Sequence, residues 1–78
     1  MKRYAIIHAA AADVVAYLPR GYEVAGEVRQ DGRTVTIIEG RDDAGWTLND
    51  YVLPRLASGL YFGEEIDLSH PAMKGLVI

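Results

Sequence analysis

Alternating apolar and polar positions predict a β-hairpin in the middle of the chain. Two such runs, residues 22–30 and 33–40, flank Asp31-Gly32, a dipeptide typical of two-residue type I′ turns. A two-residue loop makes the numbers of every cross-strand pair sum to 63, so that Val28 faces Val35. One face of the hairpin is then apolar and the other mostly polar, which is typical of a sheet covered on one side only.

The apolar face of this hairpin is expected to carry Val24, Val28, Val35 and Ile37. In the same register Val24 faces Glu39. Gly26 places no side chain opposite Ile37, so it marks either a close approach of a helix or a β-bulge.

The N-terminal half begins with a β-branched and aromatic run, residues 2–8, which predicts a strand. An alanine-rich stretch, residues 9–18, follows and ends before Pro19, which favours a helix of about ten residues that depends on packing. Asp13 offers an alternative: it could cap a shorter helix and leave the alanines as a strand end or turn.

Residues 46–59 carry the signals of a second helix. Thr47 is the expected N-cap, with Asp50 three residues later as the acidic arm of a capping box. Trp46 and Tyr51 occupy the two positions of a hydrophobic staple. Pro54 predicts either a kink or a break near Leu53 with a new turn after it. The core-facing stripe is expected to be Leu48, Tyr51, Val52, Leu56 and Leu60, and Gly59 the C-terminal stop.

These elements predict an α+β fold in the order β-α-β-β-α. A three-stranded, mainly antiparallel sheet would carry both helices on one face, the one with Val24, Val28, Val35 and Ile37. A second interpretation lacks the first helix and pairs the N-terminal strand with a partner chain. We expect residues 1–78 to form a single small domain, with 64–78 as a docked or partly mobile tail.

Composition narrows the classes of function. Hydrophobic residues make up 50% of 78 residues, more than a domain of this size easily buries, and this favours a partner or self-association. The net charge of −3 comes without a basic stripe, so neither nucleic acid nor a membrane is an expected partner. Lys2-Arg3 before an apolar run could indicate a secretory signal, but His8 and Asp13 interrupt that run. The absence of cysteine permits the reducing cytoplasm, which is the expected location.

The candidate chemical groups do not form a recognisable motif. His8 and His70 lie 62 positions apart without ligand spacing, and Asp42-Asp43 has a structural explanation beside a helix start. We therefore expect no catalytic residue, no metal and no cofactor, and an enzyme or small-ligand binder is only the third hypothesis.

The aromatic residues suggest a binding surface instead. The chain has five tyrosines, one tryptophan and one phenylalanine, too many for one small core. Trp46, Tyr61 and Phe62 are the candidate protein-interaction residues, since tryptophan and tyrosine dominate binding hot spots. The alternative is that they close the core.

The stretch AGWTLNDYVLPRLASGLYFGEEI, residues 44–66, resembles a recurring segment in small uncharacterised proteins of actinobacteria and their phages. The resemblance implies a phage or mobile-element product, a class in which small non-catalytic proteins often act by binding a host protein. It assigns no functional residue. The leading hypothesis is thus a non-catalytic protein-binding module. A more specific version of it is a phage-encoded modulator of a host protein. The alternative is a homo-oligomeric subunit that buries its apolar surface against itself.

Overall fold

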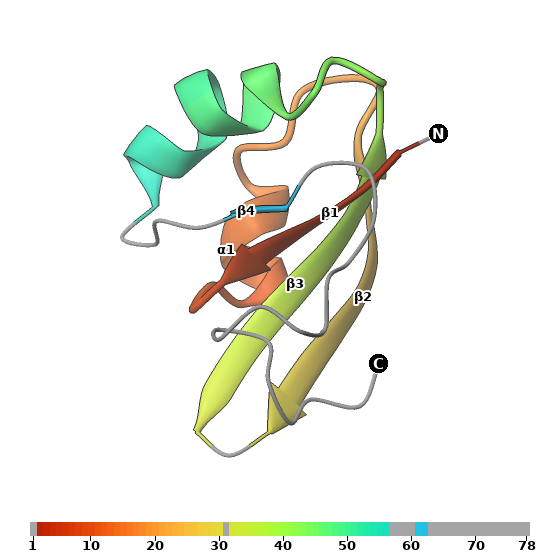
Figure 1. Ribbon diagram of the computed structural model, residues 1–78. Helices are drawn as coiled ribbons and strands as arrows, with labels where there is room; N and C mark the ends of the chain where they lie inside the picture. The colour runs from red at the N-terminus through yellow and green to blue at the C-terminus, as the bar shows by residue number, and fades with distance from the viewer. Residues whose placement is uncertain (1, 31, 57–60, 63–78) are drawn as a thin grey trace.

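The computed structural model describes residues 2–30, 32–56 and 61–62 (Figure 1). In chain order its elements are β1 (Lys2–Ile7), α1 (Ala11–Val15), β2 (Glu23–Gln30), β3 (Arg33–Gly40), η1 (Leu48–Val52), η2 (Leu53–Arg55) and β4 (Tyr61–Phe62). The predicted class, a small α+β fold with an antiparallel sheet, is confirmed.

The strands form one sheet in the order β2-β3-β1-β4, with antiparallel neighbours throughout. β1 and β2 both run opposite to β3, so they are parallel to each other with β3 inserted between them. This is a split β-α-β arrangement, and with the second helical segment and β4 the element order is the ferredoxin-like one. The sequence predicted three strands; the short β4, which pairs with Ala5 and Ile6, is the fourth.

The predicted hairpin register is confirmed from the turn as far as Gly26, which faces Ile37. Beyond that point a β-bulge shifts the pairing by one residue, so that Val24 faces Ile38 rather than Glu39. Nothing lies within 4 Å of where a Cβ on Gly26 would be. Of the two roles expected for this glycine, the bulge is therefore the one that the structure shows.

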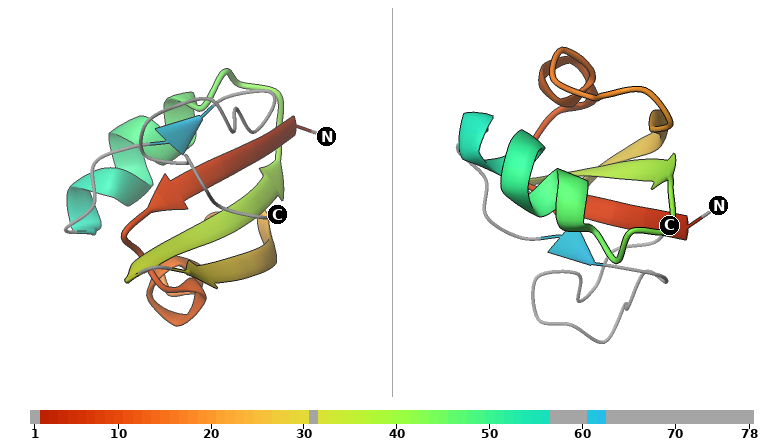
Figure 2. Two further views of the ribbon diagram at one scale, coloured as in Figure 1. Left: turned by 60° about the horizontal axis from the view of Figure 1, so that its bottom comes forward. Right: turned by 90° about the horizontal axis from the view of Figure 1, so that it is seen from above.

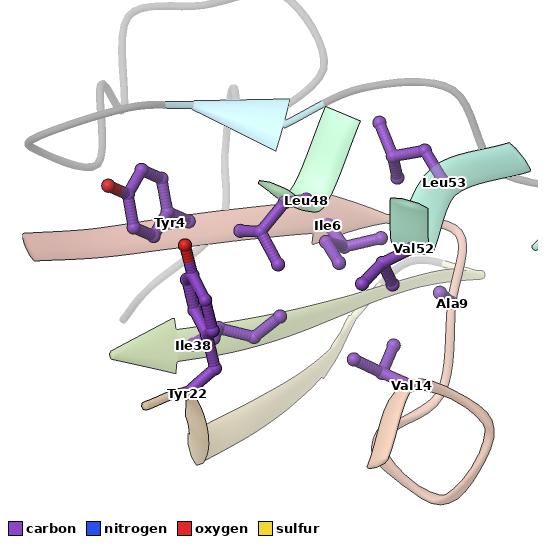
Figure 3. Packing of buried hydrophobic residues seen from close by; sticks show 9 residues of the cluster. All are labelled: Tyr4, Ile6, Ala9, Val14, Tyr22, Ile38, Leu48, Val52 and Leu53. Atoms are coloured by element: carbon purple, nitrogen blue, oxygen red, sulfur yellow. The ribbon is translucent and has the colours of Figure 1, made fainter. Parts of the chain in front are cut away.

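The helices cover the face of the sheet opposite to the predicted one. Val14 of α1 and three residues of the second helical segment belong to the same buried cluster as Ile38 of β3 (Figure 3). Ile38 points to the opposite side of the sheet from Val35 and Ile37, which were predicted to face the helices. This main cluster consists of Tyr4, Ile6, Ala9, Val14, Tyr22, Ile38, Leu48, Val52 and Leu53. Figure 2 shows α1 beside β2 and the second helical segment beside β1 and β4.

Two polar side chains explain why the helices lie on the more polar face. The buried hydroxyl of Thr36 donates to the carbonyl oxygen of Ala9 at 2.7 Å. The Glu27 carboxylate accepts the Ala11 N–H at 2.7 Å, at the start of a helix whose N-cap, Ala10, makes no side-chain bond. The polar positions of the hairpin thus bind the backbone around the start of α1, which spans only Ala11–Val15 rather than ten residues.

Three of the four residues predicted on the apolar face pack together as well; Val24 is the exception, because the bulge pairs it with Ile38 and so places it on the helix-bearing face. Ala5, Ile7, Val35 and Ile37 form a second buried cluster, joined by the half-buried Val28, and the described helices contribute no residue to it. The two central strands therefore bury both of their faces. In β1 this matches an unbroken apolar run, residues 4–7, whereas β3 buries a polar residue, Thr36, among its apolar ones.

The second helical segment, residues 46–55, changes its winding before Pro54. It begins with an α-helical turn and continues with π-helical winding in η1, where Leu53 donates its N–H to the carbonyl oxygen of Leu48. It ends with a 3-10 turn in η2, where Leu56 donates its N–H to the carbonyl oxygen of Leu53. The predicted break near Leu53 is confirmed, because Pro54 has no N–H to continue the helix. The wider winding places Leu48, Val52 and Leu53 in the core and leaves Tyr51, predicted to face the core, exposed. Gly59 and Leu60 lie outside the described residues.

We predict that Thr36→Val destabilises the protein by about 1–3 kcal/mol, since the buried carbonyl of Ala9 loses its donor. For a domain of this size each kcal/mol lowers Tm by about 4–8 °C. The same change at Thr34, half-buried and two residues away on β3, should alter the free energy of unfolding by less than about 0.5 kcal/mol. Equal stability of the two variants in thermal unfolding would contradict this role for Thr36.

Candidate protein-interaction site

The loop that leads from β3 into the second helical segment, residues 41–47, is attached to the core by two phenol groups. The Tyr4 hydroxyl donates to the carbonyl oxygen of Arg41 at 2.8 Å. The Tyr22 hydroxyl donates to the Asp43 carboxylate. Both rings belong to the main cluster, and their hydroxyls lie at the same end of it (Figure 3). The loop is therefore held by buried side chains from β1 and from the start of β2.

Asp43 organises the start of the second helical segment. Its carboxylate accepts the N–H groups of Gly45 at 3.1 Å and Thr47 at 3.3 Å, and its carbonyl oxygen accepts the Trp46 N–H at 3.0 Å. The predicted N-cap, Thr47, already has helical dihedral angles and makes no side-chain cap bond. Asp50, predicted to close a capping box, instead bonds the neighbouring Asn49 side chain. Asp43 thus performs the capping that the sequence analysis assigned to Thr47.

The loop needs two consecutive left-handed residues, Ala44 with φ 56° and Gly45 with φ 76°. A Cβ on Gly45 would overlap the ring of Tyr61, which packs against the main cluster. Glycine is therefore required both by the dihedral angle and by the ring. Tyr61 is one of the candidate interaction residues, and the structure places it half-buried behind this loop, where it supports Gly45.

The electrostatics of the loop favour a charged Asp43 beside a neutral Tyr22. Burial disfavours the charged form of Asp43, but hydrogen bonds from Thr47, Tyr22 and the backbone N–H groups outweigh it and lower the pKa of the carboxyl. Burial, and then the hydrogen bond to Asp43, raise the pKa of Tyr22. Burial likewise raises the pKa of Tyr4.

The side chain of Trp46, near the end of this loop, points into solvent, with 68% of the residue's surface exposed. It is the most exposed of the large hydrophobic residues that the structure describes. The side chain of Phe62, the third candidate, lies outside the described part of the chain. The structure thus separates the candidates: Trp46 is on the surface and Tyr61 lies behind its loop.

Two exposed residues on the helical segment 46–55, Tyr51 and Arg55, were not predicted as part of a binding surface. Tyr51 is 46% exposed, and the Arg55 guanidinium lies 4.0 Å from the centre of its ring. Arg55 also donates to the carbonyl oxygen of Tyr51 at 2.6 Å, so the pair is ordered. The hydrophobic pattern assigned Tyr51 to the core because α-helical spacing was assumed. Pro54 was the signal that the winding would change.

The residues considered for catalysis or metal binding do not lie together in the described part of the chain. Asp42 is exposed and lies 4.0 Å from the Lys2 ammonium, whereas Asp43 is bound in the loop, so the two carboxyls do not share a site. His8, predicted as a half-buried strand residue, is exposed with φ 63° just after β1. His70 falls outside the described residues. Over residues 2–30, 32–56 and 61–62 no group of three or more His, Asp or Glu side chains could hold a metal ion. None of the described helices is long and apolar enough to cross a membrane.

Comparison with models of protein families, with curated proteins and with solved structures finds no match to this chain.

We predict that Asp43→Ala lowers the free energy of unfolding by about 1–2 kcal/mol at pH 7, the cost of losing an N-cap. Asp42→Ala should cost less than about 0.5 kcal/mol, because an exposed ion pair contributes little. The pKa of Asp43 is lowered in the folded state, so its contribution is present above the unfolded value of about 3.9 and is lost as the pH falls through the folded value.

Denaturant unfolding at several pH values tests this assignment. The gap between wild type and Asp43→Ala should narrow below about pH 4, as the carboxyl becomes protonated in both states of the wild type. A gap that is independent of pH, or the larger loss in Asp42→Ala, would contradict it.

Proposed function

We propose that this chain is a non-catalytic protein-binding module and that Trp46 is the centre of its binding surface. The observation that carries the proposal is an exposed indole on a loop held by hydrogen bonds from two buried tyrosines. A large apolar ring usually enters the core of a small domain, yet this loop directs Trp46 to solvent. Such an arrangement is suited to insertion of the ring into a pocket of another protein.

The neighbouring residues support a protein partner. Tryptophan, tyrosine and arginine are the residue types most enriched among binding hot spots, and Trp46, Tyr51 and Arg55 are all exposed on residues 46–55. The ring of Tyr51 is held by Arg55, which reduces the conformational entropy lost on binding.

The charged residues near Trp46 indicate what kind of surface a partner would present. Asp42 and Asp50, at either end of the turn that carries Trp46, are exposed carboxylates, and the whole chain has a net charge of −3. Arg55 is exposed on the same helical segment and the Lys2 ammonium lies 4.0 Å from Asp42, so the complementary surface is an apolar pocket whose rim carries charges of both signs. The resemblance of residues 44–66 to proteins of actinobacteria and their phages makes a host protein the form of partner to test first.

We predict that Trp46→Ala weakens partner binding by about thirtyfold or more, as expected for a hot-spot residue that contributes about 2 kcal/mol or more. The matched control is Tyr17→Ala, which removes a 41% exposed aromatic ring from the turn after α1. The tagged full-length chain would capture its partner from an actinobacterial lysate, and calorimetry with the purified partner would compare wild type and both variants.

Binding by Trp46→Ala at wild-type affinity, with an unchanged far-UV circular dichroism spectrum, would overturn the proposal. A specific partner should also bind more weakly at high salt, because the exposed carboxylates are screened. If wild type captures nothing and light scattering instead shows concentration-dependent oligomers that Trp46→Ala abolishes, the partner is a second copy of the chain, which was the alternative hypothesis.

A further inference from the structure

We propose that Tyr22 is the positioning residue of the binding surface: its buried phenol, acting through Asp43, fixes the backbone that presents Trp46. This inference rests on the proposed function, since it concerns the same surface. It adds that the indole is held in place before any partner arrives.

The first link is the rigidity of Tyr22 itself. Its ring belongs to the main cluster and lies so close to the backbone of Gly40 that a Cβ there would overlap it. On another side the Arg41 guanidinium lies 5.1 Å from the ring centre. The Arg41 side chain in turn packs against Gly21, directly before Tyr22 in the chain. The phenol is therefore fixed on several sides, and its hydroxyl has a defined direction.

The second link is Asp43, which collects three N–H groups of the next four residues. Gly45 and Thr47 donate to its carboxylate and Trp46 donates to its carbonyl oxygen. The carboxylate can serve both amides only in one rotamer, and the Tyr22 hydroxyl holds it there. The direction of the Trp46 backbone thus depends on a hydrogen bond made by a residue that does not reach the surface.

The consequence for binding is preorganisation. A loop with two left-handed residues, Ala44 and Gly45, has alternative conformations once its hydrogen bonds are lost. Fixing it in the presented conformation removes part of the ordering cost that association would otherwise carry. Tyr22 then contributes to affinity without touching the partner.

Tyr4 provides a matched control. It is also a buried tyrosine whose hydroxyl binds the same loop, but its partners are backbone groups, the carbonyl oxygen of Arg41 and the N–H groups of Asp43 and Gly45, rather than the Asp43 carboxylate. If loss of any buried phenol loosened the loop, Tyr4→Phe and Tyr22→Phe would have the same effect. If Asp43 transmits the effect, only Tyr22→Phe disturbs Trp46.

The experiment is a ¹⁵N relaxation measurement on the full-length free protein, which requires no partner. In wild type the order parameters of the Gly45, Trp46 and Thr47 amides should be near 0.85, as in rigid backbone. In Tyr22→Phe they should fall toward 0.6 or below, while in Tyr4→Phe they should stay within about 0.05 of wild type at Trp46. Acrylamide quenching of Trp46, the only tryptophan, should rise in Tyr22→Phe alone.

Unchanged order at Trp46 in a folded Tyr22→Phe, or an equal loss in both variants, would overturn the inference. Should Tyr22→Phe unfold, Asp43→Asn answers the same question, since the amide keeps one acceptor oxygen and loses the other. That variant must show the same local loss of order, and full order at Trp46 would overturn the inference. Partner capture that fails while the order parameters behave as expected would refute the proposed function and leave the role of Tyr22 intact.

Discussion

A buried phenol donating to a carboxylate connects the sheet of this protein to the start of its second helical segment. Tyr22 lies in the core at the beginning of β2, and Asp43 lies after the end of β3. Through this contact the core determines the path of residues 41–47, and that path determines both where the helical segment begins and where Trp46 points. Tyr4 strengthens the attachment at Arg41, and Tyr61 supports it from behind Gly45.

The central hairpin shows how far local pattern can predict this fold. The dipeptide Asp31-Gly32 and the alternation around it predicted the register correctly as far as Gly26. The face that carries the helices was predicted wrongly, because a polar residue in a strand was taken to face water. Glu27 binds the first N–H of α1 and Thr36 binds the Ala9 carbonyl just before it, a long-range use of polarity that alternation alone does not reveal.

The candidate site could be predicted only in part, for a similar reason. A helix start near Trp46 was evident in the sequence, but Thr47 and Asp43 are both good capping residues, and the choice between them depends on Tyr22, twenty-one positions from Asp43. Tyr51 fits the core stripe only if the helix is α-helical throughout. Its exposure follows from the π-helical winding before Pro54. A surface position for Trp46 was one of two alternatives that the sequence left open, whereas its support by buried tyrosines required the three-dimensional structure.

The central claim is that the Asp43 carboxylate, held by Tyr22, organises the loop beneath Trp46. Amide hydrogen exchange at Gly45 and Thr47, followed residue by residue by NMR on the wild-type protein, tests it most directly, because both N–H groups donate to that carboxylate. We predict that both amides exchange well below the open-chain rate and more slowly than the amide of Asp42. Exchange of Gly45 and Thr47 at the open-chain rate, with the β1 and β3 amides still protected, would contradict it.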